Sequence, residues 1–239
     1  MEVLREAPST NAVLAERARD GAAHGLVVAA EHQSAGRGRL DRTWTAPPGT
    51  SLTFSVLLRP QTLPPARWTW LPLLTGLAVA SALRSLGYDA TVKWPNDVLL
   101  HTPEGERKVC GILVERVGDA AVVGIGLNTS LAADQLPVET ATSLSLVSGE
   151  PVDRTAVLIA VLRSLFDQYA GWLADPDETA TAYAETSGTL GRTVRAELPG
   201  GGTLTGTAVA VDGSGCLVIA TSEGAVTVAA ADVIHLRAT

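Results

Sequence analysis

Hydrophobic and polar positions alternate along residues 51–60, SLTFSVLLRP. Positions 52, 54, 56 and 58 are apolar, and three hydroxyl residues, Ser51, Thr53 and Ser55, stand between them. This period of two is typical of a β-strand with one apolar and one polar face. We therefore expect a half-buried strand that ends at the proline closing this stretch.

Apolar runs predict further strands. Residues 25–33, GLVVAAEHQ, turn from apolar to polar, which is typical of a buried strand whose end reaches a site. Residues 91–100, TVKWPNDVLL, predict a strand, a proline turn and a second strand. Residues 108–117 and 120–130 predict a hairpin that turns at the Gly-Asp pair 118–119.

Helical spacing of apolar residues predicts three helices. Residues 9–21 begin with Ser9 and Thr10, whose side chains can accept hydrogen bonds from the free amides of a first turn. Residues 72–86 begin with a proline and are followed by a glycine, which suits the start and the end of a helix. Residues 154–173 place apolar side chains on one face of a long amphipathic helix.

The composition changes after about residue 187. The last part of the chain is rich in glycine, and turns such as PGGG and DGSG separate short strand patterns. These strands are expected near residues 193–198, 203–211, 216–220 and 225–229. The pattern predicts a small antiparallel barrel. We therefore expect two domains, residues 1–187 with a mixed sheet and helices, and residues 188–239 with the barrel.

Composition limits the function. The 239 residues are 46% hydrophobic, enough for a sizeable core, and carry a formal net charge of −7. Such an acidic chain is not expected to bind nucleic acid, although it can hold a local basic pocket for a small anion. Cys110 and Cys216 are isolated and the histidines are scattered, so we expect no disulfide and no protein-built metal site. Without an apolar run of membrane-spanning length or a signal peptide pattern, we expect a cytoplasmic protein with no membrane partner.

The stretch SAGRGRLDRTWTAPPG, residues 34–49, concentrates Arg37, Arg39 and Arg42 among glycines. A guanidinium matches phosphate or carboxylate, and glycines let backbone amides approach a ligand. The stretch therefore indicates an anion-binding loop, with a solvated basic loop as the alternative. It is neither a P-loop nor a dinucleotide fingerprint, because no Gly-Lys-Ser/Thr follows and Asp41 stands at the third glycine position.

Three further stretches carry polar groups at predicted strand ends. KWPND offers the charge of Lys93 and polar contacts from Asn96 and Asp97. RKVCGILVE opens a strand with Lys108, and GIGLN ends a strand with Asn128. Each also has a structural interpretation, as a proline turn, an edge-strand lysine or a β-bulge. Combined with the arginine loop, they predict a site rich in cations and amides. Such a site can stabilise phosphate charge and position reactants, which indicates nucleotide-dependent activation of a substrate.

Five stretches in order, STN, Q-x-x-GRGRxxRxW, KWPND, K-x-x-GILVE and GIGLN, resemble the biotin protein ligases, also called biotin–[acetyl-CoA-carboxylase] ligases. The resemblance covers about residues 8–130 by motif and extends to 239 by layout. It implies an α+β fold, with a class II aminoacyl-tRNA synthetase-like catalytic domain of mixed sheet and flanking helices and a C-terminal SH3-like β-barrel. It also implies ATP-dependent formation of biotinyl-5′-AMP from biotin and MgATP. Biotin then passes to a lysine of the carboxyl carrier domain of an acyl-CoA carboxylase.

The resemblance also implies roles for individual residues. The implied biotin-binding residues are Ser9, Thr10, Asn11, Gln33, Arg37, Gly38, Arg39, Lys108, Gly111, Gly124 and Gly126. The implied ATP-binding residues are Arg39, Arg42, Trp44, Lys93, Asn96, Lys108 and Asn128. Among these, Lys108, Arg39, Arg42 and Lys93 are the implied catalytic groups, with Lys108 foremost in the activation step. Mg²⁺ is implied as a companion of ATP and not as an ion held by a dedicated protein site.

Two positions depart from the family pattern. Asp41 stands where the family usually has glycine, and its charge could weaken nucleotide affinity or change the order of the loop. Cys110 stands where a small residue is usual, and it is small enough to be tolerated. We expect residues 34–46 to be mobile until biotin binds.

Some family members carry an N-terminal DNA-binding domain and repress transcription. Only eight residues precede STN here, so we expect neither that domain nor a nucleic-acid partner. The oligomeric state stays open between a monomer and a weak homodimer.

Two other functions stay open at this point. A lipoate-attaching enzyme would share a related catalytic fold, but the intact GRGRxxRxW and KWPND stretches favour biotin. A non-catalytic regulator that binds biotin or its adenylate is the other, and the retained Lys108, Arg39 and Arg42 favour catalysis over it.

Overall fold

The computed structural model describes residues 1–40 and 42–236, and its centre is a seven-stranded mixed sheet. The strand order is β1-β2-β3-β7-β6-β5-β4. β1 and β2 run parallel, and all the other neighbours in this sheet run antiparallel. The strands are β1 (Glu2–Leu4), β2 (Val27–Ala30), β3 (Ser51–Leu58), β4 (Ala90–Lys93), β5 (Asp97–Thr102), β6 (Gly105–Val117) and β7 (Ala120–Asn128).

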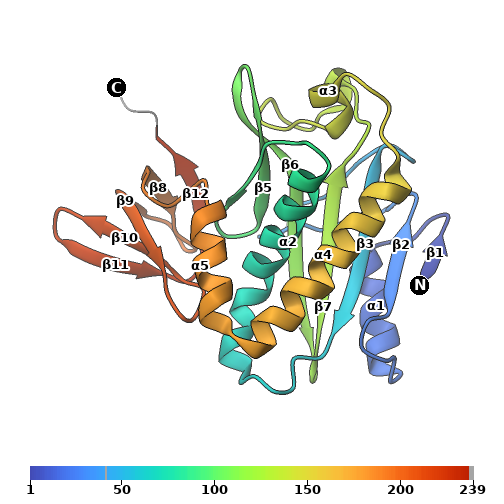
Figure 1. The fold of residues 1–239 in the computed structure, drawn as a ribbon, viewed down its shortest axis with the longest axis horizontal. Coiled ribbons are helices and arrows are strands. Elements are labelled where there is room, and N and C mark those ends of the chain that lie inside the picture. Colours follow the sequence, from blue (N-terminus) through green and yellow to red (C-terminus); the bar gives the residue numbers. More distant parts are fainter. Residues whose placement is uncertain (41, 237–239) are drawn as a thin grey trace.

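Helices cover both faces of this sheet (Figure 1). α2 (Leu71–Ser85) and α4 (Arg154–Ala174) cross one face, and α1 (Thr10–Arg19) packs on the other. These are the three helices that the spacing predicts, and β6 and β7 form the predicted hairpin. The shorter helical segments are α3 (Leu144–Ser148), α5 (Pro176–Thr186) and the 3₁₀ turns Pro65–Trp70 and Ala133–Gln135. None of the described helices is long and apolar enough to cross a membrane.

The expectation of a half-buried strand at residues 51–60 is wrong, because β3 is covered on both faces. Phe54 and Val56 belong to the core beneath α2 and α4, whereas Leu57 belongs to a second apolar cluster beneath α1. Ser55 is fully buried, and its hydroxyl meets the polar residues that begin α1. The polar face of β3 is therefore buried against other polar groups and is not a solvent-facing surface.

The C-terminal segment forms a second, five-stranded antiparallel sheet in the order β11-β10-β9-β8-β12. The strands are β8 (Thr193–Glu197), β9 (Thr203–Val211), β10 (Leu217–Thr221), β11 (Gly224–Val228) and β12 (Asp232–His235). The four predicted strands are confirmed, and β12 was not predicted. The described strands form an open sheet and not a closed barrel, because no ladder joins β11 to β12 among them. The domain boundary at residue 187 stays a prediction; α5 ends at Thr186 and β8 begins at Thr193.

Polar contacts hold the second sheet against the first. The Trp94 indole N–H donates to the Gly215 carbonyl at 3.0 Å. The Glu106 carboxylate accepts two hydrogen bonds from the Arg192 guanidinium, at 2.6 and 2.7 Å, and lies 3.4 Å from His235 Nδ1. The Glu106 side chain is only 14% exposed, so its carboxylate is shielded from most of the solvent, whereas Arg192 is 40% exposed. These contacts fix β12 next to the ends of β4 and β5, where the site lies.

Replacing Glu106 by glutamine should make folding less sensitive to acid. Burial alone would raise the pKa of the Glu106 carboxyl, but the hydrogen bonds from Arg192 and His235 and the Arg192 charge outweigh it, so the pKa lies below its ordinary value of 4.5. A carboxyl with a lowered folded-state pKa stabilises the fold above its unfolded pKa, and this stability is lost as the pH falls through the folded pKa. Thermal melts from neutral to acid pH should show the wild type losing its advantage over Glu106→Gln in the acid range.

The control for this experiment is Glu2→Gln, which removes an exposed carboxylate paired with Arg17 at 3.4 Å. Exposed pairs contribute little to stability, so its melting curve should follow the wild type at every pH. Parallel pH dependence of Glu106→Gln and the wild type would contradict the prediction.

Candidate active site

A cavity of about 370 Å³ opens between the arginine-rich loop, the ends of β4 to β7 and the second sheet. All but one of the residues that the sequence predicts for the site line this cavity. They are Ser9, Thr10, Asn11, Gln33, Arg37, Gly38, Arg39, Arg42, Trp44, Lys93, Asn96, Lys108, Gly111, Gly124 and Gly126. The structure therefore gathers residues far apart in the sequence around one space, which has a polar uncharged end and a cationic end.

The uncharged end is built at the start of α1. Gln33 Oε1 accepts hydrogen bonds from the Thr10 backbone N–H at 2.7 Å and from Thr10 Oγ1 at 3.1 Å. Because a backbone N–H can only donate, Gln33 must turn its oxygen toward Thr10, which leaves its NH₂ group to donate elsewhere. Ser9 stands at the N-cap position, yet its side chain makes no capping bond, so its hydroxyl is spared for the cavity.

Asn11 is held from three sides in this end of the cavity. Its Nδ2 donates to Leu113 O at 3.2 Å and to Glu115 Oε2 at 2.7 Å, and its Oδ1 accepts from Ser55 Oγ at 2.6 Å. Both N–H groups of the amide are used, and the oxygen keeps a second lone pair. Asn11, which is only 4% exposed, therefore offers an acceptor and not a donor to a ligand.

The glycines of β6 and β7 make room for side chains at the floor of the cavity. A Cβ at Gly124 would overlap the Asn11 amide, and a Cβ at Gly126 would lie 2.5 Å from Trp44 Cε2. A Cβ at Gly111 would lie 3.1 Å from Trp44 Cζ3. The bare backbone thus lets Asn11 and Trp44 lie flat against the sheet. The Trp44 indole nitrogen is buried there without a hydrogen-bond partner among the described residues.

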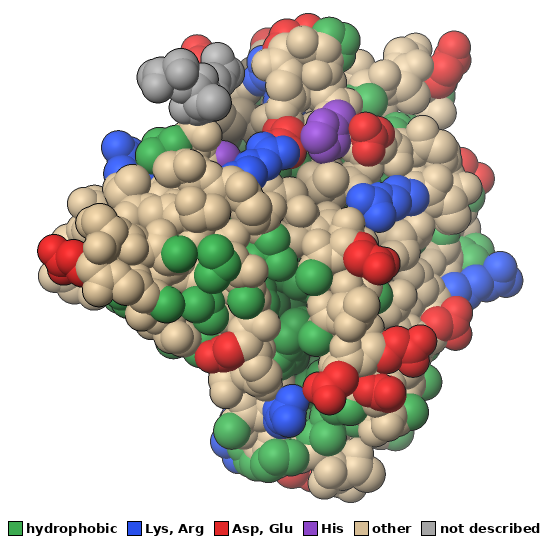
Figure 2. All heavy atoms as spheres, turned by 60° about the vertical axis from the view of Figure 1, so that its left-hand side comes forward, with side chains coloured by type: hydrophobic (Ala, Val, Ile, Leu, Met, Phe, Trp, Pro, Cys, Tyr) green, Lys and Arg blue, Asp and Glu red, His purple; other side chains and the backbone are tan. Residues whose placement is uncertain are grey.

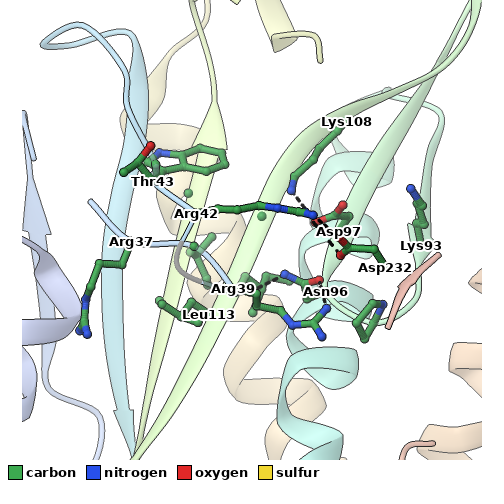
Figure 3. A pocket seen from close by; sticks show the side chains of 18 of the residues that line it. Arg37, Arg39, Arg42, Thr43, Lys93, Asn96, Asp97, Lys108, Leu113 and Asp232 are labelled. Atoms are coloured by element: carbon green, nitrogen blue, oxygen red, sulfur yellow. Dashed lines mark hydrogen bonds and ion pairs between the residues drawn. The ribbon is translucent and has the colours of Figure 1, made fainter. Parts of the chain in front are cut away.

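The cationic end holds lysines and arginines against two carboxylates (Figure 3). Lys108 Nζ lies 2.6 Å from Asp97 Oδ1 as an ion pair. Arg42 pairs with Asp232, which comes from β12 of the second sheet. Figure 3 shows the Arg42 side chain reaching across the cavity toward both carboxylates. Each of these carboxylates therefore forms an ion pair with a cation that could bind an anionic ligand in its place.

Arg39 and Asn96 form part of the wall of the cationic end. Arg39 Nη1 donates to Asn96 Oδ1 at 3.0 Å, and Asn96 Nδ2 donates to Ile112 O at 2.8 Å. This second bond fixes the amide so that its oxygen faces the guanidinium. The strand β6 thereby orients Asn96, and Asn96 orients Arg39.

Burial lowers the pKa values of two of these cations. Burial is the main cause for Lys93, with Asp97 opposing it and Lys108 adding to it. Burial is also the main cause for Arg39, while Asp232 and Asp97 raise its pKa. Burial makes the charged form of these side chains less favourable. A bound anion would stabilise that charged form by its opposite charge. The cavity is lined by five cations and three carboxylates in a chain of net charge −7, so the positive charge is local to this site.

Lys93 and Lys108 are the only lysines of the whole chain, and both line this cavity. A lysine ammonium is a compact point charge that suits a phosphate oxygen, whereas an arginine suits a two-point contact. The remaining cationic positions of the chain are arginines. Lysine is thus confined to the site, a feature that the motifs alone do not reveal.

Asn128 is the predicted residue that does not line the cavity. It is 4% exposed, its Nδ2 donates to Thr142 O at 3.0 Å, and its Oδ1 lies 3.4 Å from Ser51 Oγ. These bonds join the end of β7 to β3 and to the segment before α3. Its predicted contact with the nucleotide stays a prediction. Asp41, the departure noted in the loop, lies outside the described residues.

Sequence reasoning missed several residues of the site. Ser55 could have been found, because it stands on the polar face of an alternating strand. Asp97 of the KWPND stretch was expected to offer a polar contact, but its ion pair with Lys108 appears only in the structure. Asp232 carries no local signal, because only the packing of the second sheet brings it to Arg42. Glu115 ends the GILVE stretch, and its contacts appear only in the structure.

No group of three or more His, Cys, Asp or Glu residues that could hold a metal ion occurs in residues 1–40 and 42–236. The lining carboxylates Asp97 and Asp232 each pair with a cation. Mg²⁺ usually keeps several waters and binds through one or two carboxylates together with substrate phosphates. The donor set therefore fits a magnesium ion that enters with a nucleotide, and Asp97 and Asp232 would help to hold it.

The fold and the site define an enzyme class in which a small polar molecule and a phosphate-bearing nucleotide share one cavity. A profile of the Biotin/lipoate A/B protein ligase family matches residues 3–129, and a profile of the Biotin protein ligase C terminal domain matches residues 189–236. The chain belongs to the biotin/lipoate A/B protein ligase family.

Individual relatives agree with this family. A biotin--[acetyl-CoA-carboxylase] ligase of Mycobacterium tuberculosis is 37% identical, over 99% of this chain and 89% of its own. The bifunctional ligase/repressor BirA of Bacillus spizizenii is 32% identical, over 94% of this chain and 70% of its own. The biotin protein ligase of Aquifex aeolicus, solved with biotin and ATP, has a TM-score of 0.83 and 31% identity, covering 99% of this chain and 98% of its own. The Leishmania major enzyme with biotinyl-5-AMP has a TM-score of 0.69 and 25% identity, covering 99% and 98%.

Proposed function

We propose that this protein forms biotinyl-5′-AMP from biotin and MgATP and transfers biotin to a lysine of the biotin carboxyl carrier domain of an acyl-CoA carboxylase. The observation that carries the proposal is the division of one cavity into an uncharged hydrogen-bonding end and a cationic end. Biotin has the same division, with a ureido ring at one end and a carboxylate at the other. The relatives named above support the reaction.

The uncharged end matches the ureido group of biotin. A ureido group offers one carbonyl acceptor and two N–H donors. Gln33 has a free NH₂ group to donate to the carbonyl, and Asn11 Oδ1 has a lone pair to accept an N–H. The dithiolane ring of lipoate has no such groups, so it would leave these buried polar atoms unpaired. A site of this kind rejects a ligand that lacks the matching polar groups.

The cationic end serves the activation step. The biotin carboxylate oxygen attacks the α-phosphorus of ATP, an acyl–O–P bond forms, and the bond to pyrophosphate breaks. Lys108, Arg39 and Arg42 are placed to offset the negative charge that gathers around the phosphorus, and Lys93 lies beside them. The magnesium ion supplies further charge neutralisation on the triphosphate when it is bound.

The transfer step needs the adenylate to be kept from water until the carrier lysine arrives. The lysine amine attacks the acyl carbon, an amide forms, and AMP leaves with the bonding electrons. Described residues of the arginine-rich loop line the cavity and are held to one another, with Gly38 N–H donating to Arg42 O at 2.6 Å and Trp44 N–H donating to Gly36 O at 2.9 Å. This small hairpin is placed to exclude water from the adenylate.

The proposal extends to location and partners. We propose a cytoplasmic enzyme, a monomer or a weak homodimer, that binds no nucleic acid. The net charge of −7 supports the last point. The face in Figure 2 supports it too, because lysine and arginine side chains stand singly among acidic ones and form no basic patch there. A specific mobility shift with operator DNA at physiological salt would overturn it.

The experiment that tests the proposed function is ATP–pyrophosphate exchange with MgATP, comparing biotin, lipoate and no added acid. Exchange that depends on biotin is the expected result. Exchange with lipoate in its place would make the protein a lipoate-attaching enzyme. Tight biotin binding without exchange would make it a binding protein.

Replacing Gly124 by alanine should weaken biotin binding selectively. The new Cβ would overlap the Asn11 amide, so Asn11 must turn away and lose its hydrogen bonds to Ser55 and Glu115. We expect the KM for biotin in the exchange assay to rise by about tenfold or more, because buried polar groups are left unpaired. The KM for ATP should change little, because the phosphate-facing cations do not contact Gly124.

The matched control is Gly171→Ala in α4, where nothing lies within 4 Å of the added Cβ. Alanine favours a helix interior over glycine, so this variant should retain wild-type kinetics. Wild-type biotin KM in Gly124→Ala would argue against a biotin-contacting position for Asn11.

A further inference from the structure

We propose that Glu115 is a positioning residue that connects the biotin end of the cavity to the arginine-rich loop. This inference rests on the proposed function, because it concerns how the same site holds biotin. Glu115 lies on β6, opposite Val122 of β7, and does not itself line the cavity. It therefore acts through its neighbours and has no direct contact with substrate.

The first neighbour is Asn11. Glu115 Oε2 accepts the Asn11 Nδ2–H at 2.7 Å, the shorter of the two bonds that this nitrogen donates. The carboxylate can only accept, so it forces the amide nitrogen toward itself and the amide oxygen toward Ser55. The acceptor that Asn11 offers to a biotin N–H is thus set by Glu115.

The second neighbour is Arg37. Arg37 Nη2 lies 2.8 Å from the same oxygen of Glu115 and donates a charge-assisted hydrogen bond to it. Figure 3 shows Arg37 turned away from Arg39 and Arg42, which face the cationic end. The Arg37 side chain therefore anchors the loop to β6, while Arg39 and Arg42 face the cationic end, where they contact Asn96 and Asp232.

The loop is consequently held at two sides. Arg37 binds Glu115 of the first sheet, and Arg42 binds Asp232 of the second. The residues between them carry the backbone expected over the biotin chain and the adenylate. Glu115 Oε2 accepts hydrogen bonds from both Asn11 and Arg37. The orientation of Asn11 at the biotin end and the position of the arginine-rich loop are therefore coupled. An incoming phosphate can replace Asp232 as the partner of Arg42, but it does not compete for Glu115.

The test is steady-state ATP–pyrophosphate exchange by Glu115→Ala and Glu115→Gln. Glu115→Ala should raise the KM for biotin about tenfold, because a charge-assisted bond and the orientation of Asn11 are lost together. Glu115→Gln keeps an acceptor for Asn11 and should give a smaller rise. The kcat, the KM for ATP and the melting temperature should stay close to wild type in both variants. A joint fall in kcat and melting temperature would indicate a structural role and overturn the proposal.

A double-mutant cycle tests the connection to the loop. Glu115→Ala should have a smaller effect on the KM for biotin in an Arg37→Gln background than in the wild type, because the two residues share one interaction. Independent, additive effects would overturn the connection. Asp119→Asn is the matched control, since it removes another carboxylate–arginine pair from the same hairpin, with Arg59, away from the cavity. It should retain the wild-type KM for biotin.

The wild-type protein separates this inference from the proposed function. Wild-type exchange with biotin together with an unchanged KM in Glu115→Ala would contradict the role of Glu115 alone. No exchange with biotin in the wild type would contradict the proposed function itself. Biotin dissociation from the wild type and Glu115→Ala, measured by stopped flow, gives a second readout, and we expect it to be faster in the variant.

Discussion

Replacing Lys108 by alanine should nearly abolish biotin adenylation. Its ammonium lies at the cationic end, 2.6 Å from Asp97. In the proposed mechanism it contacts both the biotin carboxylate and the α-phosphate. Removing a group that stabilises transition-state charge typically lowers kcat by about 10²–10³-fold. ATP–pyrophosphate exchange at saturating biotin and MgATP measures this effect directly.

The control for Lys108→Ala is Arg107→Ala, the preceding residue of β6. Arg107 donates to the Glu139 backbone carbonyl and does not line the cavity, so its loss should leave exchange intact. Melting curves of both variants should stay near the wild type. Near-normal exchange by Lys108→Ala would remove this lysine from the mechanism.

Replacing Arg39 by glycine should release the adenylate before transfer. Arg39 is bonded to Asn96 and partly buried beside the other cations of the cavity, so we expect its loss to open the loop and to remove a charge that retains the adenylate. We expect release to be at least about tenfold faster, as expected for a lost charge-assisted contact. Free biotinyl-5′-AMP should then label lysines of any bystander protein, which mass spectrometry of a lysine-rich bystander would detect.

Arg5→Gly is the control, because Arg5 is exposed and does not line the cavity. It should label the bystander no more than the wild type does. If Arg39→Gly retained its adenylate as the wild type does, Arg39 would have no role in closure.

Several of the elements found from the sequence are long enough to display a period. β3, α2 and α4 each repeat their apolar spacing several times, and α2 also carries a proline in its first turn. β1 and β12 are too short for a period of two to stand out and were not predicted, whereas the similarly short β2 and β4 were found from apolar runs and a proline turn. α5 carries a capping aspartate and a first-turn proline, but its threonines and alanines give a weak apolar stripe. Its short amphipathic pattern was therefore overlooked.

The site residues also divide into those that the sequence predicts and those that only the structure reveals. Motifs locate residues that are chemically unusual for their surroundings, such as Arg39 and Lys108 in an acidic chain. Motifs do not reveal partners that tertiary packing supplies. Arg42 and Asp232 are 190 positions apart, and Arg37 and Glu115 are 78 positions apart. Whether β3 faces solvent or a polar wall also depends on where α1 packs, which alternation cannot specify.

The confinement of lysine to the cavity has a practical consequence. A reagent that acylates primary amines can modify few side chains on this protein, because its only lysines are Lys93 and Lys108. The extent of acylation at these positions would therefore report on whether the cavity is filled. The same scarcity shields the enzyme from its own reactive product, since an escaping acyl adenylate meets no lysine amine on the outer surface. A ligase with this composition offers an activated acyl group no lysine side chain of its own beyond the two that line the cavity.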